Sequence, residues 1–302
     1  MNKKIKLTIN GFETETEDGF TILQACRQNN IAIPTLCYID ELPADGACRI
    51  CLVEVEGARG LMTACSTPAA EGMIVETHSE KIISARKNVL DLILSTHRID
   101  CFSCKKLGQC KLHEYCEEYG VSFSRYQGEN RKYMIDSSNP FFDFDRNKCI
   151  LCRKCARICG QLQCVGAYAV SQRGFATHIS PENEKELEQS PCVSCGNCVS
   201  YCPTGALVPK RRESAVNSEK VLTVCPYCGV GCSLFLLVKN GKIMGAEPAN
   251  GGANQGMLCV KGKFGFRFID HPGRLKTPLV RKNGLLKEAS WEEAYSLVVS
   301  RI

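Results

Sequence analysis

Two copies of one cysteine pattern constrain what this chain can fold into more than any other feature of its sequence. Both have the spacing C-x2-C-x2-C-x3-C, first in "CILCRKCARIC" with Cys149, Cys152, Cys155 and Cys159, and then in "CVSCGNCVSYCP" with Cys192, Cys195, Cys198 and Cys202. In all, 22 of the 302 residues are cysteine, and such a density normally means disulfides or metal sites. We therefore expect bound metals or covalent bonds to supply much of the folding stability.

The amino-terminal segment helps to decide between disulfides and metals. The start "MNKKIKLTIN" is positively charged, but Ile5, Leu7 and Ile9 alternate with polar residues, which predicts a strand rather than a secretion signal. The longest apolar run, "LFLLV" at 234–238, is too short to cross a bilayer, so no transmembrane segment is predicted. We therefore expect a reducing, cytoplasmic location in which the cysteines serve as thiolate ligands.

The repeated pattern resembles the cysteine runs of two-cluster bacterial ferredoxins, in which the fourth cysteine of each run binds the other cluster. Pro203 fits the proline that ends the run in that family, whereas Gly160 in the first copy departs from it. The resemblance implies two [4Fe–4S] clusters with crossed ligands. One set is Cys149, Cys152, Cys155 and Cys202, and the other is Cys192, Cys195, Cys198 and Cys159.

An earlier cysteine group has the spacing C-x10-C-x2-C-x13-C and consists of Cys37, Cys48, Cys51 and Cys65. Alternating segments at 5–9 and 50–55 predict strands, and the stretch from Thr21 to Asn30 between them predicts a helix. The group resembles the [2Fe–2S] β-grasp domain at the start of the large iron–sulfur subunit of complex I, which implies a two-iron cluster on these four residues. A zinc site remains the alternative.

A third group, "HRIDCFSCKKLGQC", has the spacing H-x3-C-x2-C-x5-C and consists of His97, Cys101, Cys104 and Cys110. The segment before it has apolar residues at helical spacing, so the histidine is predicted at a helix end. The group resembles the [4Fe–4S] site with one histidine and three cysteines in the same relatives. A neutral imidazole in place of a thiolate is expected to raise the reduction potential, although zinc would accept these ligands too.

The last group has the spacing C-x2-C-x3-C-x26-C and consists of Cys225, Cys228, Cys232 and Cys259. It resembles the start of the bis-pterin oxidoreductases of molybdenum or tungsten, and formate dehydrogenase alpha subunits in particular, which implies a fourth [4Fe–4S] cluster. In that family Lys261 would lie on the electron path between the cluster and the pterin; the alternative is a solvated surface lysine. Further along, Ser290 and Glu293 have the spacing of a capping box at the start of a final helix.

All five sites, in this order, resemble a long formate dehydrogenase alpha subunit with an amino-terminal extension like that of complex I. The resemblance places the catalytic residues of that family beyond Ile302, so we expect no catalytic residue here and no Mo/W-pterin held by this chain alone. Three cysteines remain outside the five ligand sets. Cys26 is expected in a core, and Cys116 and Cys164 are expected to be bystanders.

The predicted fold class is α+β, with small iron–sulfur modules in series. The expected domains are a β-grasp [2Fe–2S] domain at 1–80, a histidine-ligated [4Fe–4S] domain at 81–137, a double [4Fe–4S] ferredoxin domain at 138–210, and a truncated molybdopterin-oxidoreductase [4Fe–4S] domain at 218–302. The charged run "PENEKELEQ" at 181–189 is interpreted as a solvated insertion between the two ferredoxin halves.

Charge and missing motifs limit the partners. The formal charge is +6, but five clusters with their thiolates would contribute roughly −9, so no nucleic-acid binding is predicted. Neither a G-x-G-x-x-G turn after a strand nor a Walker loop occurs in the sequence. NAD(P)H and FMN or FAD are therefore expected on a partner flavoprotein subunit, with a ferredoxin or a Mo/W catalytic subunit as further candidate partners.

Three functions compete at this point. The first is an electron-transfer subunit that carries single electrons between a flavin- and NAD(P)H-handling partner and another redox site, with electron bifurcation left open. The second is the amino-terminal part of a Mo/W formate dehydrogenase alpha subunit, and the third is a zinc or redox-sensing scaffold. An iron-hydrogenase large subunit shares the first three groups, but "CPYCGVGC" stands where its catalytic domain would begin.

Overall fold

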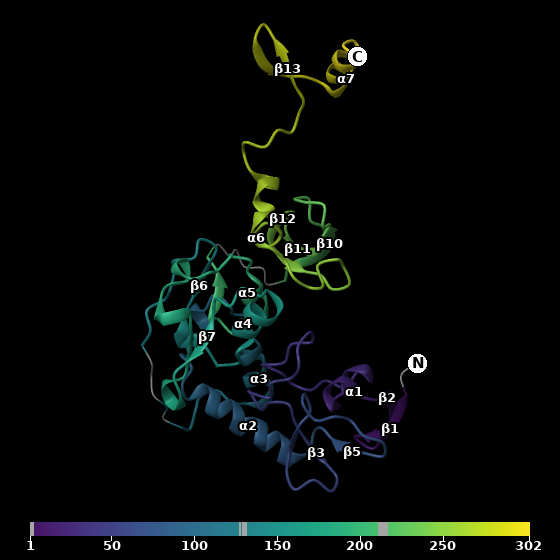
Figure 1. Ribbon diagram of the computed structural model, residues 1–302, viewed down its shortest axis with the longest axis vertical. Helices are drawn as coiled ribbons and strands as arrows, with labels where there is room; N and C mark the ends of the chain where they lie inside the picture. The colour runs from purple at the N-terminus through teal and green to yellow at the C-terminus, as the bar shows by residue number, and fades with distance from the viewer. Residues whose placement is uncertain (1–2, 127, 129–131, 211–216) are drawn as a thin grey trace.

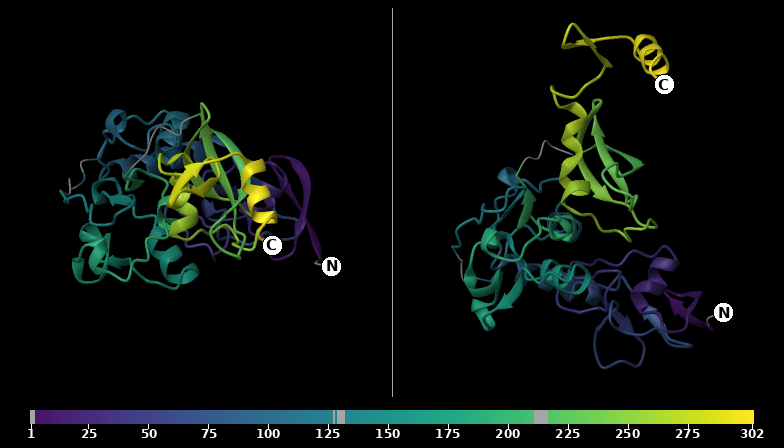
Figure 2. Two further views of the ribbon diagram at one scale, coloured as in Figure 1. Left: turned by 90° about the horizontal axis from the view of Figure 1, so that it is seen from above. Right: turned by 45° about the horizontal axis from the view of Figure 1, so that its top comes forward.

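The computed structural model describes residues 3–126, 128, 132–210 and 217–302, and it has the expected α+β architecture of small modules in series (Figure 1). The amino-terminal module lies at one end of the molecule, the ferredoxin-like module in the middle, and a final sheet beyond it (Figures 1 and 2). Within the described ranges, no helix has both the length and the apolar character needed to cross a bilayer.

The first module is a five-stranded sheet in the order β2-β1-β5-β3-β4, covered by one helix. Its strands β1 and β2 form an antiparallel hairpin, and β1 runs parallel to β5. Thr21 and Gln24 form a capping box that starts the helix at the predicted place. The elements are β1 (Lys4–Ile9), β2 (Phe12–Glu17), α1 (Ile22–Gln28), β3 (Leu52–Val55), β4 (Met62–Thr63) and β5 (Ile74–Glu76).

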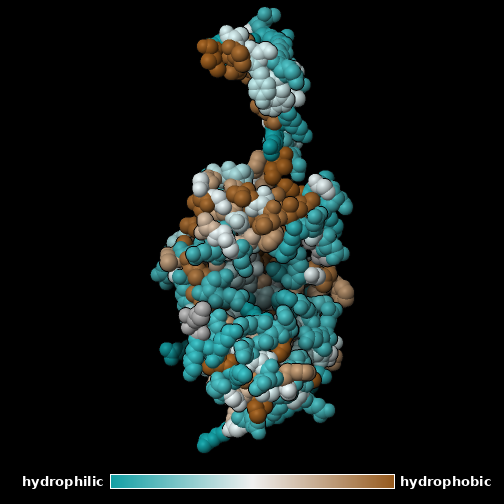
Figure 3. All heavy atoms as spheres, turned by 90° about the vertical axis from the view of Figure 1, so that its right-hand side faces the viewer, coloured by the Kyte–Doolittle hydropathy of each residue, from teal (hydrophilic) through white to brown (hydrophobic). Residues whose placement is uncertain are grey.

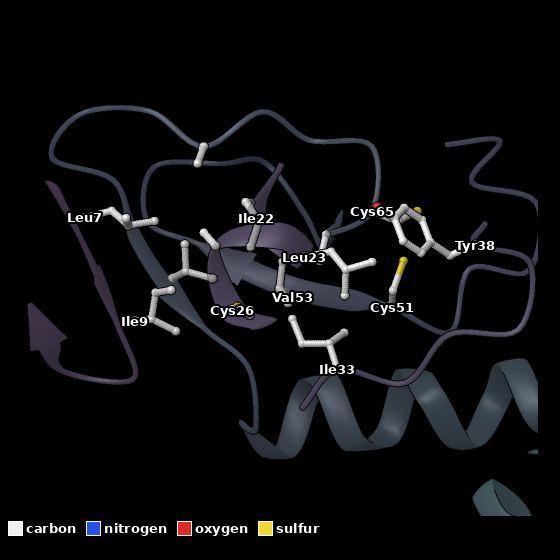
Figure 4. Packing of buried hydrophobic residues seen from close by; sticks show 14 of the residues in the cluster. Leu7, Ile9, Ile22, Leu23, Cys26, Ile33, Tyr38, Cys51, Val53 and Cys65 are labelled. Carbon is white, nitrogen blue, oxygen red and sulfur yellow. The ribbon is translucent and has the colours of Figure 1, made fainter. Parts of the chain in front are cut away.

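The core of this module fills the space between the sheet and α1 (Figure 4). The alternating residues of β1 turn Leu7 and Ile9 inward at one end of the core, while Cys51 and Cys65 lie at the other end beside Tyr38 (Figure 4). Cys26 is fully buried among the apolar residues, which confirms its interpretation as a core residue.

The second module is built on two helices, α2 (Glu80–Leu94) and α3 (Lys111–Tyr119). Ser79 caps α2 by accepting a hydrogen bond from the Ile82 backbone N–H, and His97 follows three residues after the helix ends, as predicted. The helices pack against each other and against the loops of the first module that contain Leu36 and Ile50. Their shared core contains Leu36, Ile50, Leu90, Leu94, Leu112 and Tyr119.

The ferredoxin-like module has two halves joined by paired short strands and by contact between its two helices. Its elements are β6 (Phe142–Phe144), α4 (Lys154–Arg157) continued by a π-helical turn (Ile158–Leu162), β7 (Ala169–Ser171), β8 (His178–Ser180), α5 (Asn197–Tyr201) and β9 (Leu207–Pro209).

The 181–189 segment is exposed at seven of its nine residues, as a solvated insertion should be, but it is not a free loop. Two short 3-10 turns in this segment, Glu182–Glu184 and Leu187–Gln189, attach it to the module. Leu187 is only 1% exposed and belongs to the core of the module. Glu184 accepts a hydrogen bond from His178 and forms an ion pair with Arg146. The high charge of the segment hid the single leucine that anchors it.

The final sheet has the order β10-β11-β12 and packs against a short helix. Its elements are β10 (Glu219–Val224), β11 (Ser233–Lys239), β12 (Lys242–Pro248) and α6 (Val260–Phe264), followed by a 3-10 turn (Gly265–Asp270). The Phe264 ring stacks on Phe141 of the ferredoxin-like module at a centroid distance of 4.9 Å, so the two modules are in direct contact.

The hairpin of β13 (Leu279–Lys282) and β14 (Leu285–Glu288) and the helix α7 (Trp291–Val299) extend away from the other modules (Figures 1 and 2). Apolar surface gathers on this part and around its base (Figure 3). Ser290 caps α7 as predicted, accepting a hydrogen bond from the Glu293 backbone N–H at 3.1 Å. The predicted reciprocal half of the capping box is wrong, because the Glu293 carboxylate pairs with Lys282 instead.

Candidate iron–sulfur sites

The four cysteines of the first group meet at the edge of the β-grasp core. The Cys48 backbone N–H points to the Cys37 Sγ at 3.5 Å, and the positive φ of Arg49 turns the loop between Cys48 and Cys51. A hydrogen bond with the Cys37 thiol lowers the pKa of Cys48 to about 7. The Cys51 thiol pairs with Cys65, and charge interactions connect this pair to the first.

The second group brings three cysteines together after α2. Charge interactions connect Cys101, Cys104 and Cys110, and burial raises the pKa of Cys110. Cys104 packs closely on the ferredoxin-like module, where a Cβ added at Gly205 would lie only 2.5 Å from its Sγ. The loop is therefore held between two modules.

His97 has the features of a metal-binding histidine. Burial lowers its pKa to about 4, so the imidazole is neutral at physiological pH and can donate a lone pair. One ring nitrogen bonds the Lys148 backbone carbonyl, whereas Nδ1 is buried with no hydrogen-bond partner among the described residues. Lys148 interacts electrostatically with both the imidazole and the Cys104 thiol, one of the predicted co-ligands.

The two ferredoxin-like runs exchange their fourth cysteines in space. One cavity is lined by Cys202 together with the first three cysteines of the first run, and another by Cys159 together with those of the second run. The mutual charge interactions divide in the same way. This crossed arrangement is the one implied by the resemblance to two-cluster ferredoxins.

The backbone repeats between the two runs in detail. Leu151 and Ser194, each two residues after the first cysteine of a run, both have a left-handed φ, near 55°. Each directs its backbone N–H to that cysteine's Sγ at 3.4 Å. Strained residues of this kind are expected where the backbone must present N–H groups to an anionic site.

Two side chains that the sequence analysis did not single out also approach the second run. Asn139 directs its amide Nδ2 to the Cys192 Sγ at 3.8 Å, and the buried Tyr168 hydroxyl lies 3.7 Å from the Cys198 Sγ. Burial raises the pKa of Tyr168, so its hydroxyl stays protonated and can donate. Neither residue lies in a cysteine motif, so no local pattern could have revealed these contacts.

The last group lies at the start of the final sheet. Charge interactions connect Cys232 to Cys225, Cys228 and Cys259, and burial together with these charges raises the pKa of Cys232. A hydrogen bond of 2.8 Å from the Cys225 backbone N–H to the Cys232 carbonyl closes the loop. Lys261, in the first turn of α6, lines a cavity of about 220 Å³ beside Cys225.

The two remaining cysteines differ in environment. Cys116 lies on α3, where burial raises its pKa to about 12, and it interacts electrostatically with Cys110 and Cys101. Cys164 is exposed. The structure therefore places Cys116 near a predicted site and leaves Cys164 at the surface.

The donor sets fit iron–sulfur clusters in chemistry and surroundings. Each predicted group supplies soft thiolate sulfur, with one imidazole in the second group, and several sulfurs receive backbone N–H groups as cluster ligands commonly do. In the part of the chain that the structure covers, no group of three or more His, Cys, Asp and Glu side chains converges as the ligands of a single metal ion would.

Four family models match successive segments of the chain. Residues 2–80 match a 2Fe-2S iron-sulfur cluster binding domain, and residues 86–125 match the NADH-ubiquinone oxidoreductase-G iron-sulfur binding region. Residues 139–208 match the ferredoxin-like domain of NADH-quinone oxidoreductase subunit 3, and residues 218–271 match the molybdopterin oxidoreductase Fe4S4 domain. The chain therefore contains iron–sulfur domains of both the 2Fe-2S and the 4Fe-4S type.

Known relatives cover the same series of modules. The chain is 38% identical over 99% of its length to an NADH-quinone oxidoreductase subunit of Rhizobium meliloti, and 28% identical over 99% to the putative formate dehydrogenase SAV2309 of Staphylococcus aureus. It spans about a third of each relative, 35% and 34%. A chain of the NAD+-reducing [NiFe]-hydrogenase in the H2-reduced state superposes with a TM-score of 0.64 at 28% identity, covering 68% of this chain and 87% of that one.

Proposed function

We propose that this chain is an iron–sulfur electron-transfer segment of a multisubunit oxidoreductase, holding one [2Fe–2S] and four [4Fe–4S] clusters. The exchange of Cys159 and Cys202 between the two ferredoxin-like runs is the observation that carries the proposal. An arrangement of two interlocked thiolate sets suits a pair of neighbouring clusters. When bound, such clusters accept and release one electron at a time.

The proposed ligand sets follow the five groups of side chains described above. The two-iron cluster would be held by Cys37, Cys48, Cys51 and Cys65. The four-iron clusters would be held by His97, Cys101, Cys104 and Cys110; by Cys149, Cys152, Cys155 and Cys202; by Cys192, Cys195, Cys198 and Cys159; and by Cys225, Cys228, Cys232 and Cys259.

The chain's own residues would keep water away from the route between the first sites. Leu36 and Ile50, next to cysteines of the first group, share one buried core with Leu112, which follows Cys110 by two residues. Ile150, inside the first ferredoxin-like run, packs against the same core. An apolar, close-packed region between three sites lowers the local dielectric and fixes their separation.

Hydrogen bonds to the sulfurs would set how easily each site is reduced. The Ala167 backbone N–H lies 3.2 Å from the Cys159 Sγ, and the Asn139 amide and the Tyr168 hydroxyl approach two other sulfurs of the same set. Such bonds stabilise negative charge on sulfur and so favour the reduced form. The second ferredoxin-like set has the richer set of such contacts among the described residues.

For partners, we propose a flavoprotein subunit that binds NAD(P)H and FMN or FAD, with a ferredoxin or a Mo/W catalytic subunit at the other end of the electron path. The names of the relatives, an NADH-quinone oxidoreductase subunit and an NAD+-reducing hydrogenase, support a nicotinamide-linked complex. We also propose a cytoplasmic location, because cysteines that form no disulfide among the described residues are typical of a reducing compartment.

A second candidate function is the amino-terminal part of a Mo/W formate dehydrogenase alpha subunit. The match of 218–271 to the molybdopterin oxidoreductase Fe4S4 domain favours it. So does the position of Lys261 beside both Cys225 and an apolar cavity. In this function Lys261 would lie on the electron path between the last cluster and a pterin held by other residues.

Metal and flavin analysis of the anaerobically isolated native complex tests both functions. We expect about 18 iron atoms per copy of this chain, with flavin and no molybdenum or tungsten. Stoichiometric molybdenum or tungsten would instead favour the formate dehydrogenase function. Zinc in place of iron would overturn both and leave a zinc or redox-sensing scaffold.

A further inference from the structure

Arg86 is a charged side chain buried at the seam between the first two modules. It lies on α2, is 0% exposed, and is the largest of the fully buried side chains among the described residues. Its Nη2 donates to the Leu52 carbonyl of β3 at 2.9 Å, and its Nη1 donates to the Tyr119 hydroxyl of α3 at 2.9 Å. The guanidinium therefore joins β3, α2 and α3.

The charge of Arg86 has no direct counter-ion in the part of the chain that the structure describes. Among those residues its hydrogen bonds go to a carbonyl and a hydroxyl and to no carboxylate, and its Nε is buried without a hydrogen-bond partner. One acidic group acts on it indirectly, since the exposed Glu118 bonds the Tyr119 hydroxyl. Burying an uncompensated cation is strongly unfavourable, so a nearby negative group is expected to balance it.

The first cysteine group adjoins both hydrogen-bond partners of Arg86, in the chain or in the core. Leu52, whose carbonyl accepts the hydrogen bond, directly follows Cys51. Tyr119, the second acceptor, shares a core with Leu36 and Ile50, each beside a cysteine of that group, and with Cys48 itself. A two-iron cluster with four thiolates carries a net charge of about −2 when oxidised and about −3 when reduced.

We propose that Arg86 is the buried counter-charge of the site formed by the first cysteine group, and that it raises the reduction potential of the cluster bound there. The inference rests on the two-iron assignment in the proposed function. Because the reduced cluster carries one more negative charge, a nearby cation stabilises the reduced form more than the oxidised form. Because the guanidinium is buried, salt screens this interaction weakly.

A redox titration of the isolated complex, followed by the electron paramagnetic resonance signal of the reduced two-iron cluster, separates this role from a structural tie. Arg86→Met removes the charge and keeps a long unbranched stem, Arg86→Lys keeps the charge, and Tyr119→Phe removes one hydrogen bond while the charge stays. In Arg86→Met the ratio of reduced to oxidised cluster at a fixed potential should fall about tenfold, a shift of about 59 mV downward. In the other two variants it should change less than about threefold.

An unchanged potential in Arg86→Met, or an equal shift in Tyr119→Phe, would overturn the proposal and leave the two-iron assignment intact. Absence of any two-iron signal in the unmodified complex would overturn the assignment and the inference together. If Arg86→Met does not incorporate iron, Arg86→Gln replaces it. Iron loading kept by Arg86→Lys but by neither neutral variant supports the counter-charge, whereas loading lost in all three reduces Arg86 to a structural tie and overturns it.

Discussion

Asn197 connects the ferredoxin-like module to the loop that carries the last predicted ligand. The side chain is 0% exposed at the start of α5. Its Nδ2 donates to the Leu258 carbonyl at 2.9 Å, and its Oδ1 accepts from the Leu258 backbone N–H at 3.1 Å. Leu258 directly precedes Cys259, so we predict that Asn197→Ala loosens the position of that cysteine relative to the ferredoxin-like module.

The magnitude follows from the two bonds and their burial. Each hydrogen bond contributes about 0.5–1.5 kcal/mol net, and each buried group left unsatisfied costs about 1–3 kcal/mol. Leu258 is only 3% exposed, so water replaces the lost partners poorly. We expect the segment to be destabilised by about 2–4 kcal/mol, which makes its opening roughly 30- to 700-fold more frequent.

Hydrogen exchange of the Lys263 amide in the anaerobic, iron-loaded protein measures this opening. That N–H bonds the Cys259 carbonyl at 2.9 Å, so its protection depends on the same segment and it is not itself a partner of Asn197. Ser180→Ala is the matched control. Ser180 is also a fully buried polar side chain of the ferredoxin-like module, 0% exposed, and its hydrogen bonds with Ser171 and Glu184 stay within that module.

We expect Lys263 exchange to accelerate in Asn197→Ala and to stay unchanged in Ser180→Ala. Unchanged exchange in Asn197→Ala would refute the idea that this asparagine holds the last module in place. Equal acceleration in both variants would refute it as well, because the effect would then come from general weakening of the ferredoxin-like module.

Three further predictions concern the other modules. Gly205→Ala places a Cβ 2.5 Å from the Cys104 Sγ, which should destabilise the folded protein by about 1–3 kcal/mol. It should also lower the iron content and the spectroscopic signal of the histidine-containing site. Gly160→Ala is the control, because a Cβ there has nothing within 4 Å, and it should leave both readouts unchanged. Burial disfavours the charged form of Asp91, but hydrogen bonds from Arg125 outweigh it and lower the pKa of Asp91. The resulting stabilisation is complete above the ordinary carboxyl pKa of about 4 and is lost as pH falls through the lowered value. The difference in melting temperature between the unmodified protein and Asp91→Asn should therefore be constant from about pH 5 to 8 and shrink below about pH 4, and a difference that varied between pH 5 and 8 would contradict this cause. Anaerobic chelation of iron should unfold the final sheet, whose core has four buried residues, before the β-grasp module, whose core has fifteen. Loss of protection from hydrogen exchange at the same rate in both modules would contradict this order.

Elements whose own residues form a strong local pattern were predictable from the sequence. The alternation of Ile5, Leu7 and Ile9 predicted β1, and the periodic apolar residues before His97 predicted α2. The cysteine spacing predicted which thiols would gather; the crossed sets of the two ferredoxin-like runs line one cavity each, and the five ligand sets stay predictions. These features depend on residues near one another in the chain, or on a motif whose geometry is fixed by the metal chemistry it serves.

Features that depend on distant partners were not predictable. The 181–189 segment was interpreted from its charge, but one leucine in it, Leu187, enters the core. The Glu293 side chain was assigned to a capping box, but Lys282 lies close enough to compete for it. In both cases a tertiary contact outweighed a local rule, and a single sequence gives no sign of which tertiary contact will form.

Three of the residues missed by sequence reasoning, Arg86, Asn197 and Gly205, all lie where one module meets the next. Cysteine motifs determine which atoms can bind each cluster, but they contain no information on how far one cluster lies from its neighbour. In the proposed arrangement that separation would depend on a buried guanidinium between β3 and α3, on an asparagine that holds Leu258, and on a glycine beside the Cys104 loop. Electron exchange between bound centres weakens steeply with distance, so substitutions at these junctions should slow transfer even where every ligand remains in place.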